Sequence, residues 1–252
     1  MSEKITSKNS VYIIKFLLFS IAFSALVLGF IFIASHLGGD GSQTAPTDLG
    51  RISEAPRIVI DAGHGGEDGG AVGIGEIAEK DLNLSIALDL ADMLRAAGFE
   101  VVLTREDDRL LYDPQSDYKG RKKQLDLAER LRIGESFDNA IFVSIHMNSF
   151  TDPKYSGLQV YFSPNNPTSE VLAESIQSAV ADLLQPQNKR SVKKATSRIF
   201  ILNEIKTPAV LVECAFLSNP DECKLIATPE YRKKLTFCIF SGICEFISEN
   251  SY

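Results

Sequence analysis

The chain contains three histidines, and two of them follow apolar runs that are typical of buried strands. His64 ends the run IVIDAGH at 58–64, and His146 ends the run IFVSIH at 141–146. In an open α/β sheet, ligand and metal sites form outside the carboxyl ends of the strands. Two imidazoles at two such ends are suited to hold one metal ion, and zinc accepts histidine and carboxylate ligands.

A catalytic zinc site takes three protein ligands and keeps one position for water, so we expect a carboxylate as the third ligand. Glu79 is well placed, because the first long helix begins there, on the side of the sheet where the first strand ends. Spacing alone does not choose it, and the helix dipole offers a plain alternative reason for a carboxylate at that place. The other candidates are Asp61, Glu67, Asp68, Glu76 and Asp81.

A further residue of interest lies in the nearly unbroken apolar segment PAVLVECAF at 208–216. Such a segment predicts a central buried strand, in which Glu213 is costly unless it is paired or functional. Burial raises the pKa of a carboxyl group, and a raised pKa suits a general base. The alternative for Glu213 is a structural ion pair with one of the arginines.

Strands and helices that alternate along the chain must position these residues. The first helix, between Glu79 and Gly98, joins two strands in a βαβ unit, which implies a parallel pair with a right-handed crossover. The alternation predicts an α/β fold, a single domain with a mostly parallel sheet flanked by helices. We expect strands at 57–61, 99–104, 140–146, 157–162, near 199–202 and at 209–214, and further helices at 121–136, 168–184 and 229–247.

The N-terminal segment 16–35 contains no charged residue and is long enough to cross a bilayer as a helix. Lys4, Lys8 and Lys15 precede it, and positively charged flanks stay cytoplasmic. The rest of the chain is therefore expected outside the cytoplasmic membrane. A cleaved signal peptide is the alternative, and it exports the domain equally.

Composition predicts one folded domain after this segment. We expect a signal-anchor or transmembrane segment at 1–37, a flexible linker rich in Gly, Ser, Thr and Pro at 38–56, and one catalytic domain at 57–252. The net charge of −7 gives no reason to expect nucleic-acid binding. The four cysteines lack CxxC spacing, so we expect free buried thiols rather than a structural zinc site.

Five segments of the chain have the order and spacing of a known set of motifs: DAGHGG (61–66), GEIAEKDLNL (75–84), FEVVLTR (99–105), SIHMNS (144–149) and VLVECAFLSN (210–219). Together they resemble the zinc-dependent N-acetylmuramoyl-L-alanine amidases of the amidase-3 type, over about 57–247. The resemblance implies that His64, Glu79 and His146 bind Zn²⁺ and that Glu213 is the catalytic glutamate. It thereby selects Glu79, which spacing had left open against Glu76.

Within that family, the apolar N-terminal segment and the stretches at 182–190 and 198–214 resemble the spore-cortex germination-type amidases of endospore formers. This implies removal of stem peptides from N-acetylmuramic acid during cortex (muramic-lactam) synthesis. The implied partners are peptidoglycan glycan strands with stem peptides, the membrane through the N-terminal helix, and an activating protein. In a spore former, the domain would face the intermembrane space of the forespore.

The resemblance also implies a mechanism, in which Glu213 takes a proton from zinc-activated water and passes it to the nitrogen of L-alanine. Two other functions stay open at this point. A zinc peptidase would cut within the stem peptide, whereas only an amidase leaves L-alanine as a new N-terminus. A catalytically silent wall-binding module would be marked by the loss of a zinc ligand or of Glu213, and neither is lost.

Overall fold

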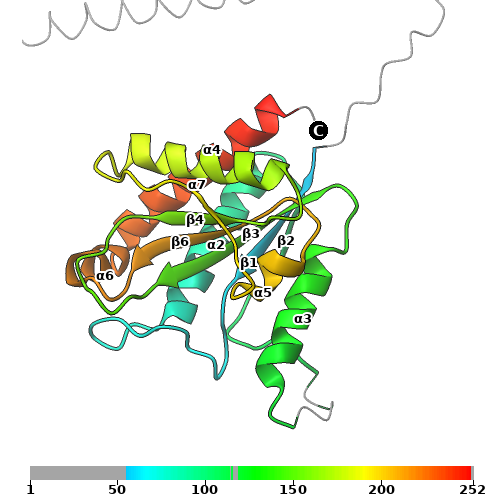
Figure 1. The fold of residues 1–252 in the computed structure, drawn as a ribbon, viewed down its shortest axis with the longest axis horizontal. Helices are drawn as coiled ribbons and strands as arrows, with labels where there is room; N and C mark the ends of the chain where they lie inside the picture. Colours follow the sequence, from blue (N-terminus) through cyan, green and yellow to red (C-terminus); the bar gives the residue numbers. More distant parts are fainter. Residues whose placement is uncertain (1–54, 114, 116–118, 251–252) are drawn as a thin grey trace, which may run out of the picture. The chain divides into compact units, whose positions relative to one another are not determined.

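The computed structural model describes residues 55–113, 115 and 119–250 (Figure 1). The expected membrane segment at 1–37 lies outside the described residues, as does the expected linker at 38–56 except for its last two residues. Within the described ranges, no helix has both the length and the apolar character needed to cross a membrane. All four cysteines are free thiols, and three of them are buried.

Within the described residues, six strands form one mixed sheet. Their spatial order is β2 (Val101–Leu103), β1 (Arg57–Ala62), β3 (Ala140–Asn148), β6 (Ala209–Phe216), β4 (Gln159–Phe162) and β5 (Lys193–Lys194). The first four strands in this order are parallel to one another, whereas β4 runs antiparallel to β6 and parallel to β5.

The expectation of a mostly parallel sheet is confirmed, because four of the five pairings among the described strands are parallel. The antiparallel β4 was not expected, and it makes the sheet mixed. A parallel neighbour needs a long crossover that brings the chain back to the same end of the sheet. The segment 149–158 between β3 and β4 contains no helix. The chain instead turns round directly and enters β4 in the opposite direction.

Helices cover both faces of this sheet (Figure 1). One face packs against α2 (Glu79–Ala96), α4 (Thr168–Leu183) and α7 (Pro229–Glu249), and the other packs against α3 (Lys122–Gly134) and α5 (Phe200–Glu204). Side chains of β1 alternate between the two cores, with Ile58 and Ile60 in the first and Val59 in the second. Burial on both faces explains why the central strands are apolar throughout.

The strand expected near 199–202 is wrong, because this segment forms the helix α5. Its buried residues are Ile201, Leu202 and Ile205, a helical spacing, whereas Phe200 is exposed. The short helix α6 (Pro220–Ile226) was not expected either. Its signal is present in the sequence, since the side chain of Asn219 caps the helix and proline follows at the first position.

Candidate active site

The backbone after β1 brings His64 to the carboxyl end of the sheet. His64 has a φ of 61°, which is uncommon for a residue other than glycine, and its carbonyl oxygen accepts a hydrogen bond from Arg130 at 2.7 Å. A Cβ atom on Gly63 would lie 2.2 Å from Nε2 of His146. Glycine at this position therefore lets the ring of His146 lie against the backbone of the first strand.

Glu79 is the first residue of α2 and is almost completely buried. Its Oε2 accepts a hydrogen bond from the amide of Ala71 at 2.8 Å, and its Oε1 accepts one from the amide of Met147 at 2.9 Å. Burial alone opposes ionisation, but hydrogen bonds and charge from His146 and His64 lower the pKa of Glu79 well below its usual range. The carboxylate is thus held in place and in its ionised form.

The two histidines and Glu79 converge on one point. Nδ1 of His146 lies 2.9 Å from Oε1 of Glu79, and Nε2 of His64 lies 3.3 Å from the same oxygen. One ligand atom from each residue lies within 4.8 Å of the others. A tetrahedral zinc ion with bonds of about 2.0–2.1 Å would hold such atoms about 3.4 Å apart, so this donor set fits zinc in spacing and in chemistry.

Glu213 lies beside this cluster, because it is the register partner of His146 in the neighbouring strand. Its Oε2 is buried and has no hydrogen-bond partner among the described residues. Burial raises the pKa of Glu213 to about 7, and the charge of Glu79 adds to the rise while His146 and His64 oppose it. Glu213 forms no ion pair within the described part of the chain, so the structural salt bridge considered from the sequence is not observed.

The other carboxylates near the first strand have different places. Asp68 approaches the cluster, with Oδ2 at 3.0 Å from Nδ1 of His64. Glu67 instead pairs with Lys122 at 2.9 Å. Asp61 is buried beneath the loop, and both Glu76 and Asp81 are exposed. Among the candidates considered from the sequence, Glu79 is the one that meets both histidines.

Two buried arginines hold the loop that carries His64. Arg130 is buried and lies 2.6 Å from Asp61 and 2.8 Å from Asp126. Arg105 is also buried and donates to the carbonyl oxygens of Ala62 and Gly63 at 2.8 and 3.0 Å. These contacts fix the backbone from which His64 projects.

Sequence reasoning missed one supporting residue, Asn83. Its amide donates to the carbonyl of Gly63 at 3.1 Å and approaches Oε1 of Glu79 at 3.4 Å. The available signal was its spacing, because residues four apart on a helix share one face and Asn83 follows Glu79 by one turn.

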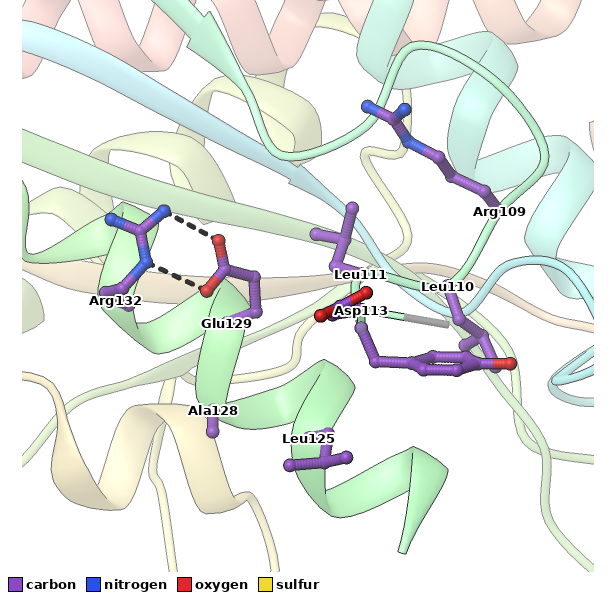
Figure 2. A pocket seen from close by; sticks show the side chains of 9 residues that line it. Arg109, Leu110, Leu111, Asp113, Leu125, Ala128, Glu129 and Arg132 are labelled. Carbon is purple, nitrogen blue, oxygen red and sulfur yellow. Dashed lines mark hydrogen bonds and ion pairs between the residues drawn. The ribbon is translucent and has the colours of Figure 1, made fainter. Parts of the chain in front are cut away.

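A separate hollow of about 780 Å³ lies between the loop 109–113 and α3 (Figure 2). Leu110, Leu111 and Leu125 line it, and the ion pair between Arg132 and Glu129 lies at one side. It contains no member of the histidine–glutamate cluster. This hollow is therefore separate from the candidate active site.

Comparison with known proteins agrees with this geometry. The chain matches the N-acetylmuramoyl-L-alanine amidase family over residues 58–245. It is 32% identical over 231 residues to the germination-specific N-acetylmuramoyl-L-alanine amidase of Bacillus subtilis. The aligned residues cover 89% of this chain and 94% of that protein.

Solved structures are similar to it as well. The CwlD amidase of Clostridioides difficile, in complex with the GerS lipoprotein, has a TM-score of 0.73 and 36% identity, covering 77% of this chain and all of that one. The amidase AmiC2 of Nostoc punctiforme has a TM-score of 0.65 and 30% identity, covering 77% of this chain and 98% of that one. The chain therefore belongs to the N-acetylmuramoyl-L-alanine amidase family and is an enzyme that acts on peptidoglycan.

Proposed function

We propose that the protein is a zinc-dependent hydrolase of the amide bond between N-acetylmuramic acid and L-alanine, with His64, Glu79 and His146 as zinc ligands and Glu213 as the catalytic base. The observation that carries the proposal is the meeting of three ligand atoms within 4.8 Å beside a buried carboxylate oxygen of Glu213 that has no partner in the described part of the chain. Two imidazoles and one carboxylate are a ligand set of catalytic zinc sites, which keep one position open.

When bound, zinc would supply Lewis acidity, which polarises a carbonyl group and makes water more acidic. The protein residues have the other tasks. Glu213 takes a proton from the attacking water and donates it to the nitrogen of L-alanine as the amide bond breaks. A pKa raised by burial suits both transfers near neutral pH, because the group can hold and release the proton. Asp68 and Asn83 orient His64 and Glu79.

Product analysis tests this proposal. Purified peptidoglycan is incubated with the full chain in detergent and added zinc, and released peptides are examined by mass spectrometry. We expect free stem peptides that begin with L-alanine. We expect none from Glu213→Gln, and normal release from Glu174→Gln, which changes an exposed glutamate on α4. Peptides with another N-terminus would instead establish a stem-peptide peptidase. No release by any form would indicate either a required partner protein or a wall-binding module.

We further propose that the substrate is cortex peptidoglycan of a spore former and that an exported protein partner assists the enzyme. Support comes from the germination-specific relative in Bacillus subtilis and from the lipoprotein bound to the similar amidase of Clostridioides difficile. The test is complementation of a Bacillus subtilis strain that lacks its own germination-specific amidase. Restored muramic-lactam in the cortex is the expected result, and lactam-free cortex despite normal amounts of the protein contradicts it.

The proposed place of action is outside the cytoplasmic membrane, which is where peptidoglycan lies. We propose that 1–37 anchors the chain, that 38–56 is a linker, and that 57–252 is the catalytic domain. The support is the uncharged segment 16–35 behind three lysines. Protease added to intact cells should remove the catalytic domain and leave a membrane-bound fragment, and protection of the whole chain contradicts this arrangement.

A further inference from the structure

A second hollow, of about 240 Å³, is lined by residues of β4 and β5, by Arg190, by the last residues of β3 and β6, and by the segment that follows β3. Strand β6 runs between β3 and β4, and Glu213 is the register partner of His146 on one side and of Gln159 on the other. Directly paired residues of neighbouring strands point to the same face of a sheet. Gln159 therefore lines this hollow directly beside the proposed base.

Gln159 presents a hydrogen-bond acceptor to which none of the described residues donates. Its Nε2 donates to the carbonyl oxygen of Ser191 at 2.7 Å and to that of Val160 at 3.4 Å, which fixes the orientation of the amide. Its Oε1 is buried and has no hydrogen-bond partner among the described residues. A buried acceptor without a donor is costly, and a bound molecule that brings an N–H group removes this cost.

Two cations line the same hollow without a carboxylate partner. The guanidinium of Arg190 lies 4.8 Å from the centre of the Phe216 ring, and its Nε donates to the carbonyl oxygen of Ser156 at 2.8 Å. The Nζ of Lys193 lies 5.9 Å from the centre of the Tyr161 ring. Neither cation forms an ion pair with any residue of the described ranges. The hollow thus combines Oε1 of Gln159, an acceptor near Glu213, with the positive charges of Arg190 and Lys193. Lys193 lies on β5, the strand that pairs with β4.

The substrate of the proposed function has a sugar on one side of the cleaved amide and a peptide on the other. The peptide brings N–H groups and carboxylates, whereas the sugar chain brings hydroxyl and acetamido groups without negative charge. We infer that this hollow binds the stem peptide, with a peptide N–H on Oε1 of Gln159 and the first free carboxylate on Arg190 and Lys193. The inference rests on the proposed function, and it adds on which side of the active site the peptide part of the substrate lies.

Arg190 is then a specificity-determining residue. A guanidinium binds a carboxylate through strong charge-assisted hydrogen bonds, and an aromatic face limits the orientations that it takes before binding. Arg190 has such a face in Phe216, with the ring of Tyr155 stacked beside it at 6.3 Å. The peptide lies along β4 and β5 in this arrangement, which leaves the glycine-rich loop after β1 for the glycan strand.

Two disaccharide tripeptides test the inference. They differ only in the second residue, D-glutamate, whose α-carboxyl group is free in one and amidated in the other. With the full chain and zinc, we expect a kcat/KM about tenfold higher for the free carboxylate. Arg190→Gln should lower this kcat/KM about tenfold and leave the value for the amidated substrate unchanged. Lys193→Gln should have a smaller effect of the same kind.

Lys194→Gln is the matched control, because this exposed lysine follows Lys193 in β5 and points to the opposite face. It should leave both kcat/KM values unchanged. An unmutated enzyme that does not distinguish the two substrates would overturn the inference. Equal losses on both substrates in Arg190→Gln would also overturn it, because they indicate a structural role.

Calorimetry with the two free tripeptides separates this inference from the proposed function, since binding does not need cleavage. In one outcome, the protein cleaves neither substrate but binds the free-carboxylate tripeptide, and Arg190→Gln abolishes this binding. This outcome supports the hollow as a peptide site and removes the amidase mechanism. Cleavage of both substrates without carboxylate preference, and without tripeptide binding, keeps the amidase mechanism and overturns the peptide site.

Discussion

Two groups of charged side chains lie at the carboxyl ends of the central strands, and they differ in how burial is compensated. Around Asp61, at the end of β1, the charges are paired: the carboxylate accepts hydrogen bonds from Arg130 at 2.6 Å, from Thr104 at 2.7 Å and from Ser144 at 2.6 Å. Around Glu213, two strands away, the carboxylate has an oxygen that is buried and without a partner among the described residues.

The difference shows in the pKa values of the two carboxyl groups. Burial opposes ionisation of Asp61, but Arg130 and the hydroxyl groups overcome it and lower the pKa. Burial of Glu213 is not overcome, and its pKa rises to about 7. The paired charges around Asp61 hold the backbone in place. The incompletely paired charge of Glu213 is instead available to a bound cation and a substrate. Substitutions of Glu213 should therefore lower activity, and substitutions of the partners of Asp61 should lower the free energy of unfolding.

The largest expected effect is on catalysis at the unpaired group. Glu213→Gln keeps the shape of the side chain and removes its ability to accept a proton. We expect kcat to fall by about 10²–10⁴, the usual contribution of a general base, with zinc content unchanged. Steady-state kinetics and elemental analysis measure the two quantities. A kcat within a factor of two or so of the unmutated value would remove Glu213 from the mechanism.

Loss of a partner in the paired group should destabilise the fold. Arg130→Met leaves Asp61 and Asp126 buried without their cation, and we expect the free energy of unfolding to fall by about 3–5 kcal/mol. Arg132→Met on the same helix breaks an exposed pair with Glu129 that solvent screens, and should leave the free energy of unfolding nearly unchanged. Urea unfolding compares them, and equal losses in the two variants would contradict the distinction.

The pH dependence of stability should have opposite signs at the two carboxyl groups. Asp61 has a lowered pKa in the fold, so it contributes stability above its ordinary pKa of 3.8 and loses it as the pH falls through the folded value. Glu213 has a raised pKa, so the unfolded chain releases this proton first, and stability falls as the pH rises from 4.5 to about 7.

Unfolding of the metal-free protein between pH 4 and 8 measures the Glu213 contribution. Glu213→Gln should remove a fall of about 3 kcal/mol over this range. The same pH dependence in the variant and in the unmutated chain would show that Glu213 does not titrate there.

The smallest expected effect is on the orientation of a zinc ligand. Asp68→Asn keeps the shape of the side chain near Nδ1 of His64 but removes its charge. We expect zinc affinity to weaken about tenfold, at the low end for such partners because Asp68 is partly exposed. Glu67→Gln is the control, since Glu67 pairs with Lys122 and not with the cluster. Competition with a chelator measures both, and equal affinities would exclude the proposed support.

The sequence predicted the strands that end in His64 and His146, because apolar runs buried on both faces are strong signals. It did not predict α5, since a run of only five residues is too short to distinguish a helix from a strand by periodicity. The antiparallel entry of β4 was missed because strand direction depends on which neighbours pair, and no local pattern records that.

For the site, residue types and strand ends indicated two histidines and Glu213, whereas spacing left the third ligand open between Glu79 and its neighbours. The family resemblance selected Glu79 as the third ligand, and in the structure Glu79 contacts both histidine rings. Gln159 could not have been identified from the sequence. Its importance depends on a cross-strand register with Glu213 and on one acceptor without a partner.

The most direct test of the central claim is to locate the metal. Crystals grown with zinc, measured on both sides of the zinc absorption edge, give an anomalous map that shows zinc alone. We expect one strong peak at about 2.0–2.2 Å from a nitrogen of His64, a nitrogen of His146 and an oxygen of Glu79. A zinc peak elsewhere, with Glu79 still hydrogen-bonded to His146 as at present, would contradict it.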